Sequence, residues 1–290
     1  MPIKHILLAI LVAAIYGVAF VAIKTGVSEI PPLLLTGYRY LFAAIPMVFF
    51  VGRPDVSWRW LTAYGVMQGV IMFGLIFTAV AWEMPGGLAS IVVQMQVFFT
   101  ILFSIMAFGE RPSLAQFMGA AIALAGIAVI GWDQAQLAPV LPFVMVLAGA
   151  AAWGAANVIA KAARPSAMLS FVVWSALAAP VPLFLLSAIF EHTVFGLPPN
   201  APSMAAIASI AFLAWPTTVF AFSAWVFLLR KYEAATVTPF ALLIPVFGMG
   251  STALAFGERM TLAAALGAAL IFAGLIVNLF GGKLMRKFAL

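Results

Sequence analysis

The five residues Ala107-Phe108-Gly109-Glu110-Arg111 return as Ala255-Phe256-Gly257-Glu258-Arg259, a shift of 148 positions along the chain. The same register continues without a gap through two further glycine pairs, Gly119 with Gly267 and Gly126 with Gly274. Chance similarity between apolar segments explains matching glycines, but it does not explain two matching charged pairs. This stretch therefore predicts an internal sequence repeat.

A second set of matches lies near the start of each half. Gly17 and Lys24 correspond to Gly154 and Lys161, and both pairs are separated by 137 positions. Together the two sets of matches divide the chain into a first repeat over residues 1–133 and a second over residues 134–290.

The composition predicts that both repeats lie within a membrane. Hydrophobic residues make up 66% of the chain and charged residues 8%, whereas soluble proteins have roughly 45–50% apolar and about 25% charged residues. Only helices and closed barrels satisfy their backbone polar groups in lipid, and the long apolar runs lack the alternation of a barrel strand. We therefore predict an all-α polytopic membrane protein.

Charged residues, Pro and Gly divide the chain into apolar segments of about 20 residues, the length that spans a hydrocarbon core. This division predicts ten transmembrane helices, at residues 5–25, 32–51, 60–82, 86–108, 113–131, 140–162, 168–190, 204–229, 234–256 and 261–280. Each repeat then holds five helices, an odd number, so the second repeat must enter the membrane in the opposite orientation. Inverted repeats are common in secondary transporters, whose substrate site lies near the midplane where the repeats meet.

The basic residues set the predicted orientation, because cytoplasmic loops carry an excess of Lys and Arg. With the N-terminus inside, eleven of the 14 basic residues lie on the cytoplasmic side and only Lys24 and Arg259 lie outside. We therefore expect both termini in the cytoplasm, and the net charge of +6 reflects this orientation rather than a nucleic-acid partner.

Several stretches carry a resemblance to a known family. They are Gly17 to Lys24, Pro31-Pro32-Leu33 with Arg39, Pro85 to Ser90 continuing through Gln94, Gln96 and Phe98-Phe99-Thr100, and the two Gly-Glu-Arg turns. With these stretches the chain resembles the EamA-type family of the drug/metabolite transporter superfamily. It is most similar there to bacterial exporters of amino acids and their metabolites, including the cysteine and O-acetylserine exporter, and more distantly to the aromatic amino acid exporters.

The resemblance implies a fold, a location and an activity. Members of this kind have ten helices in two inverted five-helix repeats around a central cavity, bordered mainly by helices 1, 3, 4, 6, 8 and 9. We accordingly expect an exporter of the bacterial inner membrane, with the lipid bilayer and a small molecule as partners and with no cofactor. Whether it is a monomer or a homodimer stays open.

Two glutamines of the fourth predicted helix are candidates for the cavity wall. Gln94 and Gln96 are two residues apart, about 200° around an α-helix, so they cannot face the same cavity. Gln94 shares its face with small and polar residues, which favours it as the cavity residue. Hydrogen bonding between helices is the structural alternative for either glutamine.

Aromatic residues of the first and sixth helices form the second group of candidates. Trp153 and Asn157 are four residues apart and share one helix face. The 137-residue shift places Tyr16 and Phe20 at the corresponding positions of the first helix. We expect these four side chains to line the cavity from both repeats, with simple packing as the alternative. Further candidates from the third and eighth helices are Gln68, Phe220 and Trp225.

Three basic residues could act along the transport pathway. Arg39 is the basic residue deep within a predicted span, where a charge usually faces protein or water and is often functional. It could pair with a substrate carboxylate, but helix 2 is not a usual cavity helix of the family, so a structural role is favoured. Lys24 and Lys161 lie near opposite mouths of the pathway, where they could attract cargo or anchor the helix ends.

Two prolines interrupt the ninth predicted helix. Pro239 and Pro245 each remove a helical hydrogen bond and predict a kink, which could act as a gate hinge or be a static bend.

An intramembrane enzyme is the alternative from another functional class. The sequence has no Gly-x-Ser-x-Gly or His-Glu-x-x-His pattern, no cysteine and no pair of carboxylates within a span, so it lacks the groups that such chemistry requires. We expect neither enzymatic activity nor a metal site.

Nucleotide-sugar or sugar-phosphate exchange and small multidrug efflux are the alternatives among carriers. The phosphorylated anions would need several cationic residues in the cavity, and Arg39 is alone in that position. A carboxylate within a span would support proton-coupled drug efflux, but all eight acidic residues lie at span ends or in loops. The sequence therefore favours amino acids and related metabolites, while the cargo and any coupling ion stay open.

Overall fold

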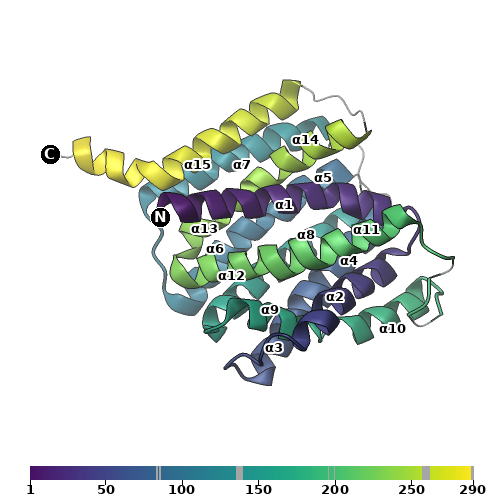
Figure 1. The fold of residues 1–290 in the computed structure, drawn as a ribbon. Helices are drawn as coiled ribbons and strands as arrows, with labels where there is room; N and C mark the ends of the chain where they lie inside the picture. Colours follow the sequence, from purple (N-terminus) through teal and green to yellow (C-terminus); the bar gives the residue numbers. More distant parts are fainter. Residues whose placement is uncertain are drawn as a thin grey trace.

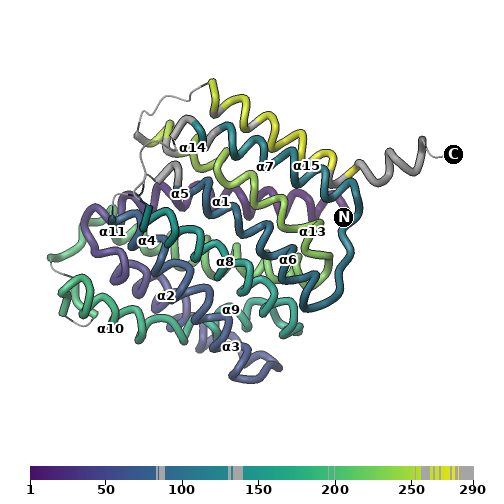
Figure 2. Tube along the Cα trace, turned by 180° about the vertical axis from the view of Figure 1, so that it is seen from behind, coloured from purple at the N-terminus to yellow at the C-terminus, as the bar shows by residue number. Residues whose placement is uncertain are grey.

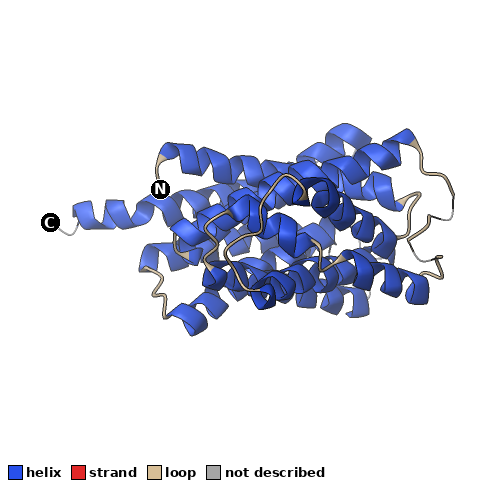
Figure 3. Ribbon diagram, turned by 60° about the horizontal axis from the view of Figure 1, so that its bottom comes forward, coloured by secondary structure: helices blue, strands red, loops and turns tan. Residues whose placement is uncertain are grey.

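The computed structural model describes residues 1–82, 84, 86–134, 140–194, 196–198, 200–256 and 262–288. Within these ranges every regular element is a helix, as Figure 3 shows. The α-helices are α1 (Ile3–Val27), α2 (Pro32–Val48), α3 (Trp58–Gly65), α4 (Phe73–Ala81), α5 (Gly86–Val92), α6 (Gln96–Phe108), α7 (Leu114–Gln134), α8 (Val140–Ala163), α9 (Met168–Ala176), α10 (Pro180–Phe190), α11 (Met204–Phe212), α12 (Phe222–Lys231), α13 (Ala234–Val237), α14 (Ile244–Phe256) and α15 (Leu262–Phe288).

Seven helical stretches in the described ranges are long and apolar enough to cross a membrane. They are Ile3–Val27, Trp58–Ala81, Ala89–Phe108, Val140–Ala163, Met168–Phe190, Met204–Lys231 and Ala234–Ala255. The three other predicted spans coincide with shorter apolar helices of 10–17 residues, Pro32–Val48, Leu114–Val129 and Ala265–Gly274. The protein is therefore a multi-pass α-helical membrane protein, and the count of ten spans stays a prediction.

Four of these stretches are not regular α-helices throughout. Residues Val66–Met72 and Leu213–Ala221 form π-helices, and Val93–Met95 and Thr238–Leu243 form 3₁₀-helices. Such irregular turns widen or tighten a helix locally and frequently occur at functional sites. Each of the four either contributes a residue to the lining of the cavity described below or adjoins one.

Equivalent glycines of the two halves make equivalent close contacts between helices. A Cβ atom on Gly17 in α1 would lie 2.4 Å from Phe247 Cβ and 2.8 Å from Gly248 N in α14. A Cβ on Gly154 in α8 would likewise lie 2.7 Å from Phe99 Cβ and 2.9 Å from Thr100 N in α6. Phe99 and Thr100 precede Phe247 and Gly248 by 148 positions, and Gly17 precedes Gly154 by 137. The two contacts are therefore related by the same shifts as the sequence repeat.

The helices α7 and α15 pack against one another with the same reciprocity, on one side of the bundle (Figures 1 and 2). A Cβ on Gly126 would lie 2.5 Å from Gly267 O, and a Cβ on Gly274 would lie 2.5 Å from Gly119 O. Small residues at both contacts let the two backbones approach closely, which stabilises helix pairs in lipid.

Both chain ends lie at the same end of the bundle in Figure 1. At the opposite end the Glu191 carboxylate accepts hydrogen bonds from the first turn of α2, from Leu33 N at 2.7 Å and Leu34 N at 3.2 Å. The loop after α10 is held to the end of α1, because Ser203 N and Ser203 Oγ donate to the Glu29 carboxylate at 2.9 Å and 2.6 Å.

Candidate functional site

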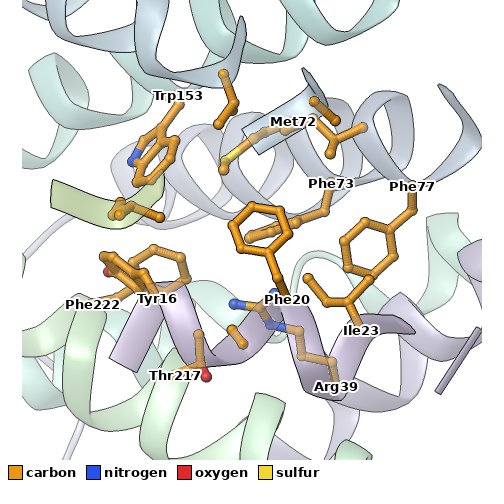
Figure 4. Close-up of a pocket in the computed structure, with 15 residues that line it drawn as sticks. Tyr16, Phe20, Ile23, Arg39, Met72, Phe73, Phe77, Trp153, Thr217 and Phe222 are labelled. Atoms are coloured by element: carbon orange, nitrogen blue, oxygen red, sulfur yellow. The ribbon is translucent and has the colours of Figure 1, made fainter. Parts of the chain in front are cut away.

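A cavity of about 50 Å³ lies in the middle of the bundle, between helices of both halves (Figure 4). By this measure one water molecule needs about 10–15 Å³, so the cavity has room for about four waters. Its lining residues are Tyr16, Ala19, Phe20, Ile23, Arg39, Met72, Phe73, Ile76, Phe77, Ala89, Val93, Trp153, Thr217, Phe222 and Ile244. The cavity is smaller than an amino acid, so cargo can enter only if the surrounding helices separate.

Aromatic rings from both halves form the walls. The Tyr16 ring in α1 meets the Trp153 ring in α8 edge to face, with the ring centroids 5.9 Å apart. The Tyr16 ring also packs against Phe222 at 5.2 Å, and Phe222 packs against Phe73 at 6.3 Å. Tyr16 and Trp153 occupy the same position in the two repeats, so this pair lies where the two halves meet.

Arg39 is the charged residue of the lining. Its side chain is 1% exposed, and its Nε donates a hydrogen bond to Thr218 Oγ1 at 2.8 Å. The guanidinium carbon lies 4.0 Å from the centroid of the Phe73 ring, a cation–π contact. Its Nη2 is buried without a hydrogen-bond partner, and no carboxylate of the described residues pairs with it.

This position places Arg39 in the cavity lining, and the choice between a structural role and contact with cargo stays a prediction. The family resemblance implied that helix 2 stays outside the cavity, which favoured a structural role. In the structure α2 contributes Arg39 to the lining, because the π-helix Leu213–Ala221 presents Thr218 as the acceptor that fixes the guanidinium there.

Asn157 lies beside the cavity rather than in its lining. Its Nδ2 donates to Thr100 Oγ1 at 2.9 Å and to Gln96 Oε1 at 3.3 Å, and its Oδ1 accepts from Trp225 Nε1 at 3.0 Å. These bonds join α6, α8 and α12 in the buried interior. Asn157 and Trp225 thus form hydrogen bonds between helices, and their role as cavity residues stays a prediction.

The two glutamines of the fourth span are also buried outside the lining. Gln94 Nε2 donates to Ser90 O at 3.1 Å, whereas Val93, its neighbour, lines the cavity. The lining face of this helix is the one that carries Ala89 and Val93, four residues apart. Gln96 belongs to the Asn157 network.

Of the remaining predicted cavity residues, one lies in the lining and two lie outside it. Phe20 lines the cavity together with Tyr16 and Trp153. Gln68 is buried and bonds to Met72 Sδ at 3.2 Å without reaching the lining. Phe220 is 45% exposed and lies on the outer surface of its helix, so it is not a wall of this cavity.

The two pathway lysines lie at opposite ends of the bundle. Lys161, in the last turn of α8, forms an ion pair with Glu110 and donates to Tyr232 O at 3.1 Å. The Glu110 carboxylate also accepts from Ala234 N at 3.1 Å, at the start of α13. This cluster connects three helix ends near the start of α1, whereas Lys24 is exposed at the far end of α1. The second Gly-Glu-Arg turn, at residues 257–259, lies outside the described residues.

The predicted bend of the ninth helix coincides with an irregular segment. Pro239 lies in the 3₁₀ segment Thr238–Leu243, between α13 and α14, and Pro245 lies in the first turn of α14. Both residues are buried. A role as a gate hinge stays a prediction.

Sequence reasoning missed much of the third helix, where Met72, Phe73, Ile76 and Phe77 form one wall. Met72 ends the π-helix Val66–Met72 and the other three residues follow it, and this π-helix shifts the face that a regular helix would present. Phe222 was missed as well, although it lies three residues before Trp225 and thus on the same helix face.

The described residues contain no group of three or more His, Cys, Asp or Glu side chains that could hold a metal ion.

Comparisons with known proteins agree with a role in transport. Two matches to the EamA-like transporter family cover residues 3–132 and residues 141–280, one for each half of the chain.

Two curated relatives carry the same description. A protein of Escherichia coli strain K12 named probable amino-acid metabolite efflux pump is 39% identical, over 96% of this chain and 95% of its own length. A protein of Salmonella typhimurium with that name is 38% identical, over 96% of both chains. An uncharacterized transporter of Bacillus subtilis is 28% identical.

A solved crystal structure shares the fold. It superposes on 99% of this chain and 99% of its own, with a TM-score of 0.79 and 20% sequence identity.

Proposed function

This chain belongs to the EamA-like transporter family, and on that basis we propose that it exports amino acids and related small metabolites across the bacterial inner membrane. Cargo passes through the central cavity by alternating access. The names of the two relatives with 38% and 39% identity support this class of cargo.

One observation carries the assignment of the cavity. Tyr16 and Trp153 occupy equivalent positions of the two repeats, line the same cavity and touch one another. A site between two repeats is the arrangement that alternating access requires, because rocking one repeat against the other opens the site to each side in turn.

The proposal includes ten transmembrane helices in two inverted five-helix repeats, at residues 1–133 and 134–290. The reciprocal glycine contacts of α1 with α14 and of α8 with α6 support an approximate two-fold relation between the halves. We place both termini in the cytoplasm, so the Lys161–Glu110 cluster closes the cytoplasmic end in this conformation.

Purified protein in liposomes tests this function. Liposomes loaded with unlabelled leucine or cysteine should accumulate the labelled amino acid by exchange, whereas a labelled sugar phosphate and a cationic dye should not exchange. The proposal is refuted if no amino acid or amino-acid derivative exchanges while the sugar phosphate or the dye does.

A further inference from the structure

Three hydrogen-bond donors of the cavity lining have no partner. They are Arg39 Nη2, Trp153 Nε1 and the Tyr16 hydroxyl. Their side chains are 1%, 4% and 6% exposed, so bulk solvent does not reach them and the missing acceptors must lie inside the cavity. Because leaving such groups unbonded costs free energy, a set of three in one cavity indicates a missing acceptor.

We propose that Arg39, Trp153 and Tyr16 bind the carboxylate of the cargo, and that the cavity recognises its cargo by this carboxylate and not by an ammonium group. The inference rests on the proposed transport function and names the chemical class that the site selects.

The donor inventory supports a carboxylate. Guanidinium and indole nitrogens only donate, and a carboxylate only accepts, so the two sets are complementary. A carboxylate also neutralises the buried charge of Arg39, which is unfavourable while it stays uncompensated.

The same inventory disfavours recognition of an ammonium, which needs acceptors. None of the described lining residues is acidic. Thr217, whose hydroxyl donates to Phe212 O at 3.1 Å, and Tyr16 offer only neutral hydroxyl oxygens as acceptors, and an ammonium would be repelled by the Arg39 guanidinium. The other favourable contacts open to an ammonium are those with the faces of the aromatic rings.

The rings of Tyr16 and Trp153 are in contact, and Arg39 is held beside the same aromatic wall. The Phe222 ring centroid lies 5.2 Å from that of Tyr16 and 5.7 Å from Arg39 Cζ, and Tyr16 in turn touches Trp153. Figure 4 shows the guanidinium of Arg39 reaching from α2 toward the rings of Tyr16 and Phe222. The bond to Thr218 uses Nε and the Phe73 ring covers one face of the guanidinium, whereas Nη2 has no hydrogen-bond partner and stays available for the cargo.

Three small molecules with the same side chain test the proposal: leucine, leucinamide, which lacks the carboxylate, and 4-methyl-2-oxopentanoate, which lacks the ammonium. Binding is measured on the purified protein by the rise in its unfolding temperature, independently of transport. We expect the oxo acid to bind at least as well as leucine and leucinamide to bind about tenfold more weakly or worse. Equal binding of leucinamide and leucine, or much weaker binding of the oxo acid, overturns the proposal.

Variants then test whether each of the three donors binds the carboxylate. Arg39→Gln should weaken binding of the oxo acid by about tenfold or more, and Trp153→Phe and Tyr16→Phe by several-fold, because these two keep the ring and lose only the donor. Trp174→Phe is the matched control, since its Nε1 bonds to Val51 O at 3.2 Å away from the cavity. Unchanged binding in the Trp153 and Tyr16 variants refutes the donor set even if Arg39→Gln fails to fold.

The transport assay keeps the two claims apart. If the oxo acid binds through Arg39 but neither it nor leucine is exchanged across liposomes, the proposed function fails and the binding site stands. If leucine is exchanged but Arg39→Gln binds and exchanges it as the wild type does, the binding site fails and the proposed function stands.

Discussion

Replacement of Gly17 by alanine should destabilise the protein, because α1 and α14 touch at this glycine. The added methyl group would lie 2.4 Å from Phe247 Cβ and 2.8 Å from Gly248 N. Both atoms belong to or adjoin the backbone of α14, so no side-chain rotation can relieve the overlap. The two helices must move apart by about 1 Å to reach an ordinary contact of about 3.5 Å.

The magnitude follows from two opposing effects. Overpacking in a close-packed interior costs up to about 3 kcal/mol, and a short contact to backbone belongs at the upper end of that range. Alanine is favoured over glycine within a helix by about 1 kcal/mol. We therefore expect a net loss of about 2 kcal/mol in the free energy of unfolding, taking the difference of these two values.

Thermal unfolding in detergent measures this loss, and the chain supplies its own control. A Cβ on Gly250, in the same helix α14, would meet nothing within 4 Å, so Gly250→Ala should unfold at the wild-type temperature or above it. Gly154→Ala should behave like Gly17→Ala, because its methyl group would lie 2.7 Å from Phe99 Cβ. An unfolding temperature for Gly17→Ala equal to that of Gly250→Ala would refute the reasoning.

Three further predictions concern residues outside the cavity. Glu110→Gln removes the ion pair with Lys161, whose side chain is 17% exposed. The loss in the free energy of unfolding should lie between the ~1 kcal/mol of an exposed pair and the ~3–5 kcal/mol of a buried one. Thermal unfolding measures this loss, and an unchanged unfolding temperature contradicts the prediction. Trp225→Phe leaves Asn157 Oδ1 without its donor. It should lower the free energy of unfolding by about 1–3 kcal/mol without changing cargo affinity. Weaker cargo binding in a variant of unchanged stability would show that Trp225 belongs to the cargo site. Phe220→Ala should leave the exchange rate in liposomes unchanged, because its ring is 45% exposed; a large loss of exchange would place it on the pathway.

Much of the fold follows from the sequence because its signals are local. Apolar segments of membrane-spanning length and the recurrence of Gly17 at Gly154 lead directly to helices and to the close contacts that the glycines make. The breaks within helices were harder to predict. The π-helices Val66–Met72 and Leu213–Ala221 depend on packing around the cavity, and only Pro216, in the second of them, interrupts the sequence pattern.

The repeat helped to predict part of the cavity lining. Trp153 was a candidate by itself and the 137-residue shift added Tyr16 and Phe20; all three lie in the lining, and their contact with cargo stays a prediction. Gln94 and Asn157 were expected in the wall because polarity in a span favours a pathway, but the Gln94 amide bonds to Ser90 O in its own span and the Asn157 amide to Thr100 in α6. Sequence cannot separate these roles, because it does not show which partner a buried amide takes in the fold.

The location of Arg39 could not be read from the sequence for the same reason. Its depth in the span is visible there, but its acceptor, Thr218, lies 179 positions away. Only the fold shows that this acceptor takes Nε and leaves Nη2 in the cavity lining without a partner.

The central claim is that cargo crosses the membrane through the cavity between the two halves. The chain contains no cysteine, so a single cysteine at Ala19, which lines the cavity, reports on access directly. A membrane-impermeant thiol reagent should label Ala19→Cys in liposomes from each side of the membrane, and saturating cargo should slow the labelling. Ala150→Cys, at a fully buried position outside the lining, should stay unlabelled. Labelling of Ala19→Cys from only one side, or at a rate that cargo does not change, would contradict the account.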